Sequence, residues 1–96
     1  MAAFVIVDTA IENADAYESY KVQAKPIAEK YGGRYRVRGG DMTLHETDLW
    51  TPTRFVIIEF PDRQSAEGFD NSPEYAPVKP IRQQNARCTL FIVDGD

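Results

Sequence analysis

The sequence predicts an α+β fold with the element order β-α-β-β-α-β, the ferredoxin-like arrangement around a four-stranded antiparallel sheet. Three observations predict it. Four segments are rich in β-branched and aromatic residues, as strands are. A stretch with apolar residues every three or four positions separates the first two segments, as in an amphipathic helix. Capping residues and prolines mark further helical pieces between the last two segments.

Length and composition limit the classes of protein to consider. A chain of 96 residues is expected to form a single domain, residues 1–96. Its formal net charge of −4 argues against nucleic-acid and anionic-membrane partners. The first residues do not show the basic and apolar pattern of a secretory leader, so we expect none; no apolar run reaches membrane length, and Cys88 is the only cysteine. We therefore expect a cytoplasmic, reduced setting and a buried, inert thiol rather than a nucleophile.

Residues 2–8 are expected to form the first strand, and residues 12–33 contain the first helix. Asn13 or Asp15 can cap this helix, and Gly32 can end it. Pro26 removes a backbone donor inside the run, which predicts a kink or two consecutive short helices. The stripe expected to face the core consists of Tyr17, Tyr20, Ala24, Ile27 and Tyr31.

The middle of the chain is expected to form a hairpin. Residues 34–46 are predicted as the second strand, residues 48–53 as the turn and residues 54–60 as the third strand. The glycine pair at positions 39–40 predicts a bulge or a sharp bend within the second strand. The alternation of arginine with other residues at the start of that strand is typical of an edge.

The last part of the chain is expected to hold short helices and a final strand. Asp62 can cap a helix that runs to about Asn71. Ser72 followed by Pro73 is a strong signal for the start of another helix. Further prolines interrupt that helix, so a short or irregular piece is expected up to about Gln84. Residues 86–94 are predicted as the fourth strand.

The strand patterns also predict an assembly. The first, third and fourth strands carry consecutive apolar residues, which indicates burial of both faces of the sheet. Two helices can cover only one face, and a monomer rarely exposes an apolar patch the size of a sheet. We therefore expect a homodimer in which two sheets pack face to face, an α+β barrel.

The basic second strand suggests a site. Period-two alternation places Arg34, Arg36 and Arg38 on one face, and Arg36 or Arg38 can reach Glu59 across the hairpin. In a cavity between the sheet and the dimer mate, Arg38 would hold a ligand oxygen and Glu59 would orient it or move a proton. The alternative is structural: solvated edge arginines and an ion pair that neutralises Glu59. The expected apolar walls are Phe4, Ile6, Phe55 and Ile57.

Other candidates each have a functional and a structural interpretation. His45, the only histidine, is either a surface residue or a proton shuttle at the cavity mouth, and it excludes a multi-histidine metal site within one chain. Trp50 either packs in the dimer interface or covers the pocket. Tyr75 and Arg82 either pack among helices or close the cavity from the side. Asp8, at the end of the first predicted strand, is a weaker candidate than Glu59 for the same two roles, a structural ion pair or a functional carboxylate in the site. We expect no cofactor and no metal.

Three stretches resemble, in order and spacing, the family known as domain of unknown function 1330: YGGRYRVRGG (31–40), LWTPTRFVIIEFPD (49–62) and FDNSPEYAPVKPIRQ (69–83). The opening AAFVIVD and DAYESYK fit as well, so the resemblance covers nearly the whole chain. Pro80 departs from the expected helix former and leaves the shape of the last helix open. The matching positions are Gly32, Gly33, Arg38, Gly39, Gly40, Trp50, Glu59, Phe60, Pro61, Ser72, Pro73, Tyr75 and Arg82.

The resemblance implies a small bacterial protein of the dimeric α+β-barrel superfamily. That superfamily includes cofactor-independent monooxygenases, haem-degrading enzymes and lactone isomerases, whereas the family itself has no settled activity. Our first hypothesis is a homodimeric pocket protein for a small, partly apolar, anionic or carbonyl-bearing molecule. Monooxygenase-like or isomerase-like catalysis enters by analogy alone. The alternative is a non-catalytic ligand sensor or interaction module with a structural Arg–Glu pair.

Overall fold

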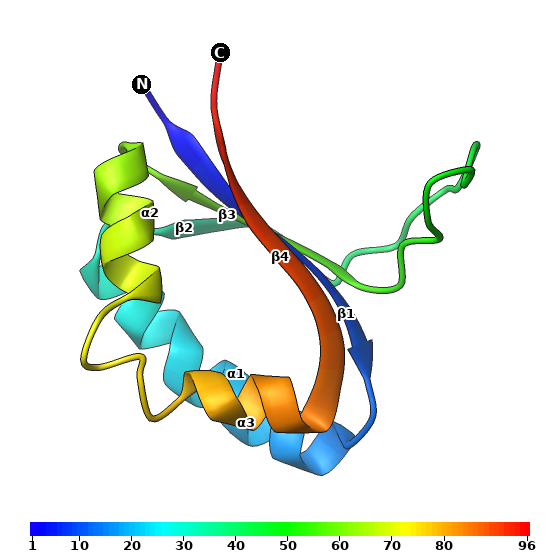
Figure 1. The fold of residues 1–96 in the computed structure, drawn as a ribbon, viewed down its shortest axis with the longest axis horizontal. Coiled ribbons are helices and arrows are strands. Elements are labelled where there is room, and N and C mark those ends of the chain that lie inside the picture. The colour runs from blue at the N-terminus through cyan, green and yellow to red at the C-terminus, as the bar shows by residue number, and fades with distance from the viewer.

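The computed structural model describes residues 1–96 as one antiparallel sheet with three helices against one of its faces (Figure 1). The strand order β2-β3-β1-β4 confirms the predicted ferredoxin-like arrangement, with β1 and β3 in the centre. The elements in chain order are β1 (Ala3–Ile11), α1 (Ala14–Lys30), β2 (Arg34–Arg38), β3 (Phe55–Phe60), α2 (Arg63–Asp70), α3 (Lys79–Asn85) and β4 (Ala86–Asp94).

The core lies between the helices and one face of the sheet. Alternate residues of β1 and β3 point into it, because successive side chains of a strand face opposite ways. Small residues on α1, Ala24 and Ala28, let the helix approach the sheet closely, while Phe60 and Phe69 stack on each other. The buried strand residues are Val5, Val7, Val56, Ile58 and Phe60.

Helix α1 is a single helix that runs unbroken through Pro26. The alternative of two short helices was therefore wrong. The Asn13 side chain accepts a hydrogen bond from the backbone N–H of Ala16 at 3.1 Å, which caps the start. The chain turns at Gly32, whose φ of 91° lies in the left-handed region that favours glycine. The predicted stripe does face the core: Tyr17 and Ala24 are buried, and Tyr20, Ile27 and Tyr31 pack against them.

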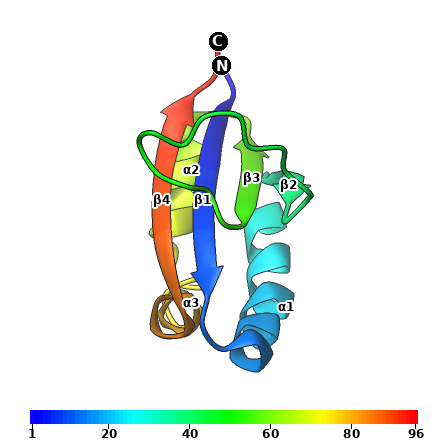
Figure 2. The same ribbon diagram turned by 90° about the vertical axis from the view of Figure 1, so that its right-hand side faces the viewer.

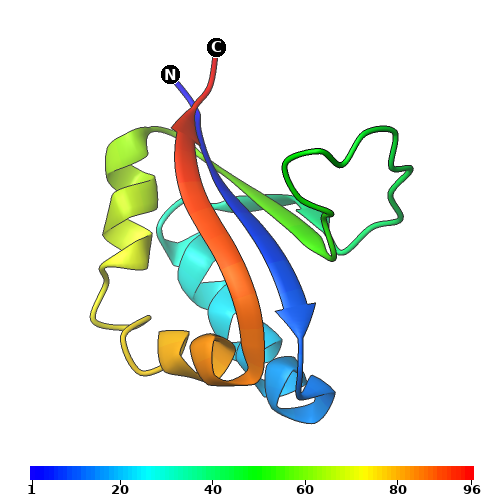
Figure 3. The same cartoon turned by 45° about the vertical axis from the view of Figure 1, so that its right-hand side comes forward.

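Strand β2 is shorter than predicted. It ends at Arg38, and residues 39–54 form a long irregular loop, which we call the arm. The prediction of a strand through residue 46 was wrong, because Gly39 takes a φ of 74° and turns the chain out of the sheet. The arm extends from the sheet on the side away from the helices (Figures 2 and 3).

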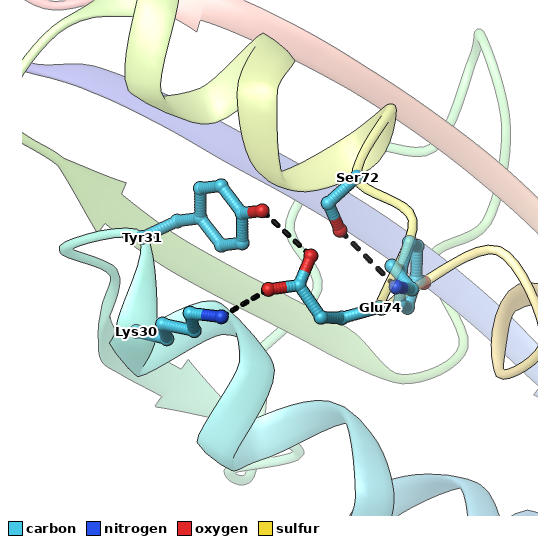
Figure 4. Close-up of polar contacts among 5 residues, drawn as sticks. Lys30, Tyr31, Ser72 and Glu74 are labelled. Atoms are coloured by element: carbon cyan, nitrogen blue, oxygen red, sulfur yellow. Dashed lines mark hydrogen bonds and ion pairs between the residues drawn. The ribbon is translucent and has the colours of Figure 1, made fainter.

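The segment between β3 and β4 is held by side-chain caps (Figure 4). Asp62 caps α2 as predicted, since its carboxylate accepts from the Ser65 N–H at 2.7 Å. Ser72 Oγ accepts from the Tyr75 N–H at 3.1 Å but opens only a turn, and α3 begins at Lys79. Pro80 lies in the first turn of α3, where a missing N–H costs little.

The second face of the sheet, which we call the open face, carries no helix (Figures 1 and 2). No helix in the structure has the length and apolar character needed to cross a bilayer. Phe91 of β4 is 40% exposed, and four apolar residues of the arm are exposed on the same side. These arm residues are Met42, Leu44, Leu49 and Trp50. The open face and the arm together form the main exposed apolar surface of the chain.

Candidate functional site

A β-bulge decides where the predicted site residues lie. Tyr35 pairs with Ile58, but the next pair is Val37 with Ile57, so Arg36 is the extra residue. The extra residue reverses the facing of every residue after it. Arg38 therefore pairs with Val56 and points to the helix side, and its predicted place on the same face as Arg36 and Glu59 was wrong.

Arg38 borders a cavity between α1, α3 and the sheet, which we call the helix-side cavity. Its volume of about 30 Å³ is room for roughly two water molecules. The apolar walls are Val7, Ala24, Val56 and Ile58, and three tyrosines, Tyr17, Tyr20 and Tyr35, add aromatic surface. The charged lining consists of Lys21, Arg38, Arg54 and Arg82.

Two of these arginines lie at the end of the cavity near β2. The guanidinium of Arg38 lies 5.0 Å from the centre of the Tyr35 ring and donates to the Lys21 carbonyl at 3.2 Å. The guanidinium of Arg54 lies 5.5 Å from the centre of the Tyr17 ring. Both contacts are cation–π pairs. Burial raises the pKa of Tyr35 to about 12, although Arg38 opposes this shift. Tyr35 is therefore a neutral platform for the charge of Arg38.

The third arginine, Arg82, lies near β4 and is only 5% exposed. Its Nε has no hydrogen-bond partner. Burial works against its charge, yet the neighbouring Tyr75 and Tyr20 phenols and the Cys88 thiol raise the pKa of Arg82 overall. The Tyr20 and Tyr75 hydroxyls are 2.7 Å apart. Burial, with Tyr75 nearby, raises the pKa of Tyr20, so this phenol stays protonated and can donate a hydrogen bond.

No carboxylate lines the helix-side cavity. Arg38, Arg54 and Arg82 form no ion pair, while Lys21 pairs with Glu18 outside the cavity at 2.9 Å. Lys21 chiefly, and Arg54 and Arg38 less strongly, hold the pKa of Glu18 below its usual range. A buried charge is normally paired, because leaving water costs it free energy. Of the three arginines that line the cavity, only Arg82 is buried, and it has no counter-ion from the chain.

The other predicted charged residues lie away from the cavity. Glu59 accepts from Arg36 Nε at 2.9 Å on the open face, which confirms one of the two predicted pairings. The other, between Glu59 and Arg38, does not form. Phe4, Ile6, Phe55 and Ile57 alternate onto the same open face and do not line the helix-side cavity. His45 is exposed on the arm, and no group of three or more histidine, cysteine or acidic side chains could hold a metal ion.

Asp8 and Trp50 together fix the base of the arm. The Asp8 carboxylate accepts from Trp50 Nε1 at 2.8 Å and from the backbone N–H groups of Thr53 at 2.8 Å and Arg54 at 3.1 Å. Asp8 lies within β1, which continues to Ile11, so the predicted strand end at residue 8 was wrong. Its carboxylate orders the chain just before β3. This arrangement also sets the position from which the Arg54 side chain enters the cavity.

The sequence did not single out Tyr17, Tyr20, Lys21, Tyr35 or Arg54 for the site. The tyrosines on α1 were placed in the core stripe, where they do lie, but their hydroxyls and faces also line the cavity. The only pattern that could have pointed to one of these residues is the position of Arg54, a charged residue directly before an apolar strand. Strict alternation puts Tyr35 and Arg38 on opposite faces, so only knowledge of the bulge would have joined them.

Comparison with solved structures agrees with this fold. A protein of unknown function from Rhodopseudomonas palustris is 18% identical, with a TM-score of 0.77 over 99% of this chain and 82% of that one. SnoaB, a cofactor-independent oxygenase from Streptomyces nogalater, is 11% identical, with a TM-score of 0.68 over 99% and 93%. A dimeric ferredoxin-like protein of unknown function from Jannaschia sp. CCS1 is 10% identical, with a TM-score of 0.71 over 99% and 100%.

The sequence comparisons point to one family. No curated protein matches the chain significantly. Residues 2–96 match the family described as "Domain of unknown function (DUF1330)", as the motifs around the two glycine pairs, β3 and Ser72 suggested. The match covers nearly every residue of the fold and of the helix-side cavity. The chain therefore belongs to the DUF1330 family.

Proposed function

We propose that this protein is a homodimer whose helix-side cavity binds a small, partly apolar molecule with an anionic or carbonyl oxygen. The observation that carries the proposal is Arg82, a buried guanidinium with an unpartnered Nε and no ion pair. Arg38 and Arg54 add two more unpaired charges to the same space. A ligand oxygen that accepts from these groups supplies the missing partner, and charge-assisted hydrogen bonds of this kind are the strong ones.

The rest of the lining suits the apolar part of such a ligand. Val7, Val56 and Ile58 present aliphatic surface, and the rings of Tyr17 and Tyr35 add aromatic surface. Ligand pockets usually combine a mainly apolar wall with a few polar groups that fix orientation. The place proposed here differs from the cavity between sheet and dimer mate that the sequence suggested, because the bulge carries Arg38 to the helix side.

Catalysis is a second candidate function, and the buried tyrosine pair supports it. A protonated Tyr20 beside Tyr75 and Arg82 can donate to an oxygen on which negative charge develops, as an oxyanion site does. SnoaB, a cofactor-independent oxygenase, has a related fold, which makes this chemistry worth testing without assigning it. The alternative of a non-catalytic module is supported by the Arg36–Glu59 pair on the open face.

The ligand proposal is tested by thermal melting of the whole protein with a panel of small carboxylates, phenols and ketones. We expect at least one compound to raise the melting temperature, because a ligand that binds only the folded state stabilises it. The variant Arg38→Met should lose this response. The matched control Arg36→Met, which changes the same residue type on the open face, should keep it. A response lost in Arg36→Met and kept in Arg38→Met would place the ligand on the open face instead.

The homodimer is supported by the surface opposite the helices. The open face carries Phe4, Ile6, Phe55, Ile57 and Phe91, and a second copy is the partner whose open face has the same size and apolar character. The Jannaschia protein with a related fold is described as dimeric.

Light scattering tests the homodimer. Phe91→Asp is expected to convert a dimer to a monomer, because a charge would be buried in the apolar contact. Val22→Asp is the control, since Val22 is 73% exposed on the outer side of α1. A wild type of 10.9 kDa at micromolar concentration would contradict the proposal.

A further inference from the structure

The positive charges of the helix-side cavity are divided between two ends. Arg38 belongs to β2, one edge strand of the sheet, and Arg54 lies directly before β3. Arg82 approaches from α3 and lies beside Cys88 of β4, the other edge strand. We call these the β2 end and the β4 end of the cavity. The two edge strands are separated by three strand spacings, about 14 Å in total at the backbone.

The strand register shows what lies between the two ends. Arg38 pairs with Val56, Val56 pairs with Val7, and Val7 pairs with Leu90 on β4. One row across the sheet therefore runs from a guanidinium at the β2 end over two valines toward the β4 end. Both valines line the cavity, and no acidic group interrupts the row. Val56 of β3 and Val7 of β1 thus give the cavity an apolar floor between the two edge strands.

Each end has the features of an oxygen-binding group. At the β2 end, Arg38 makes a single hydrogen bond, to the Lys21 carbonyl, and leaves its other donors free. At the β4 end, Arg82 Nε has no partner and the Tyr20 and Tyr75 hydroxyls lie beside the guanidinium. One monoanion can reach and neutralise one end only. The opposite end would then keep a guanidinium without an anionic partner, which costs most at Arg82, because Arg82 is buried whereas Arg38 is exposed.

We propose that the ligand of this cavity is a dianion whose two acidic groups are separated by a short apolar segment, of the class of small dicarboxylates. This inference rests on the proposed ligand-binding function and narrows its ligand class. One acidic group binds Arg82 with the tyrosine hydroxyls, and the other binds Arg38 and Arg54. The carbon chain between them lies over Val7 and Val56.

The β2 end is the end that can open. The cavity holds about 30 Å³, which is too small for a dicarboxylate, so side chains must move to admit it. Arg38 and Lys21 also border an outer groove of about 330 Å³ between α1 and β2. The same two side chains thus separate the cavity from the outside. Arg38 is held only by the Tyr35 ring, 5.0 Å from its guanidinium, and by one hydrogen bond. Its side chain can therefore rotate outward to admit the ligand and then rotate back to bind the second acidic group.

The inference is tested by calorimetric titration of the intact protein with matched pairs of compounds. The dianions succinate, adipate and suberate are compared with the monoanions butyrate, hexanoate and octanoate, which share their chain lengths. We expect one dianion to bind at least about tenfold more tightly than its monoanion partner. Arg38→Met should weaken binding of the dianion far more than binding of the monoanion, and so reduce that advantage to near unity. Arg36→Met should leave both affinities unchanged.

The outcomes distinguish the dianion inference from the broader proposal that the helix-side cavity binds a small molecule. If monoanions bind as tightly as their dianion partners, the dianion inference is wrong and the ligand-binding function stands. If no compound of either series binds, and the carbonyl and phenol panel also leaves the melting temperature unchanged, both fail. Because Arg82 is buried, Arg82→Gln is interpreted only with a native circular-dichroism spectrum. Arg38→Met, at a more exposed position, keeps the test decisive if Arg82→Gln does not fold.

Discussion

Two charged side chains in the α2–α3 region have opposite environments. Glu74 is well satisfied: Lys30 forms an ion pair with it, and the Tyr31 hydroxyl donates to it at 2.7 Å (Figure 4). Arg82, a few residues further along, is buried without an acidic partner. The first residue ties the turn before α3 to the end of α1. The second has no such structural partner, which is why we connect it with a ligand.

The Glu74 contacts predict a pH dependence. The Lys30 and Tyr31 hydrogen bonds hold the pKa of Glu74 down to about 2, from an ordinary value of 4.5. A lowered carboxyl pKa contributes stability above the unfolded-state pKa and loses it as pH falls through the folded-state pKa. We therefore expect Glu74→Gln to be less stable than wild type at neutral pH, with the difference shrinking between pH 4.5 and about 2.

Urea unfolding across that pH range measures the Glu74 effect. The matched control is Glu46→Gln, which changes an exposed carboxylate of the arm that makes no hydrogen bond or ion pair. It should leave the pH profile of stability close to that of wild type. A constant gap between wild type and Glu74→Gln across the range would contradict the proposed role of the ionised carboxylate.

At the scale of elements, the short strand β2 does two things at once. Its bulge turns Arg38 toward the helices, and Gly39 then ends the strand with a positive φ. A Cβ atom on Gly39 would come within 2.8 Å of Arg54 Nε. The absence of a side chain at this position therefore lets Arg54 pass the end of β2 and enter the cavity. Gly39 thus determines both where β2 ends and whether the Arg54 guanidinium can reach the cavity.

The adjacent glycine provides a matched test of this role. Gly39→Ala should lower the free energy of unfolding by about 1–3 kcal/mol, because alanine is strained at φ 74° and crowds Arg54. Gly40→Ala should change it by less than about 0.5 kcal/mol, since no atom lies within 4 Å of a Cβ added there. Chemical denaturation of both variants measures the difference. Equal effects would mean that Gly39 has no special constraint.

The sequence predicted most helices and strands, but it did not predict the bulge in β2 that decides where Arg38 lies. Periodicity and caps placed β3, α2 and β4 correctly, because each combines a regular pattern with a local stop signal. Strand β1 was found but runs three residues further than predicted. The bulge at Arg36 has no such signal: it follows from pairing with β3 and from the exit at Gly39. Since one extra residue reverses the facing of the next, the site assignment built on strict alternation failed at Arg38.

At the scale of the whole molecule, the two faces of the sheet differ in what covers them. The helices cover one face and enclose the cavity, and the arm extends beyond the other (Figures 1 and 3). Leu49, near the end of the arm, is 91% exposed. An apolar side chain this exposed is unfavourable in a monomer in water, and it could instead contact a second copy on the open face.

This placement predicts a role for the arm in assembly. Leu49→Asp should raise the dimer dissociation constant at least about tenfold, because it replaces apolar contact by a charge that must lose water. Sedimentation velocity over a range of protein concentrations measures the constant. Val22→Asp, a change of the same kind on the outer side of α1, should have no effect. Equal constants for wild type and Leu49→Asp would remove the arm from the interface.

The three hydrogen bonds of Asp8 connect these two surfaces. The same carboxylate holds Trp50 of the arm and the backbone of Arg54, whose side chain enters the cavity. If a ligand draws Arg54 into a new position, the shared carboxylate would also bias the arm, which we propose contacts the second copy. Thermodynamic linkage then makes the effect mutual: whatever factor the ligand applies to dimer affinity, the dimer applies to ligand affinity. Asp8 would in that case be the residue through which occupancy and assembly are coupled.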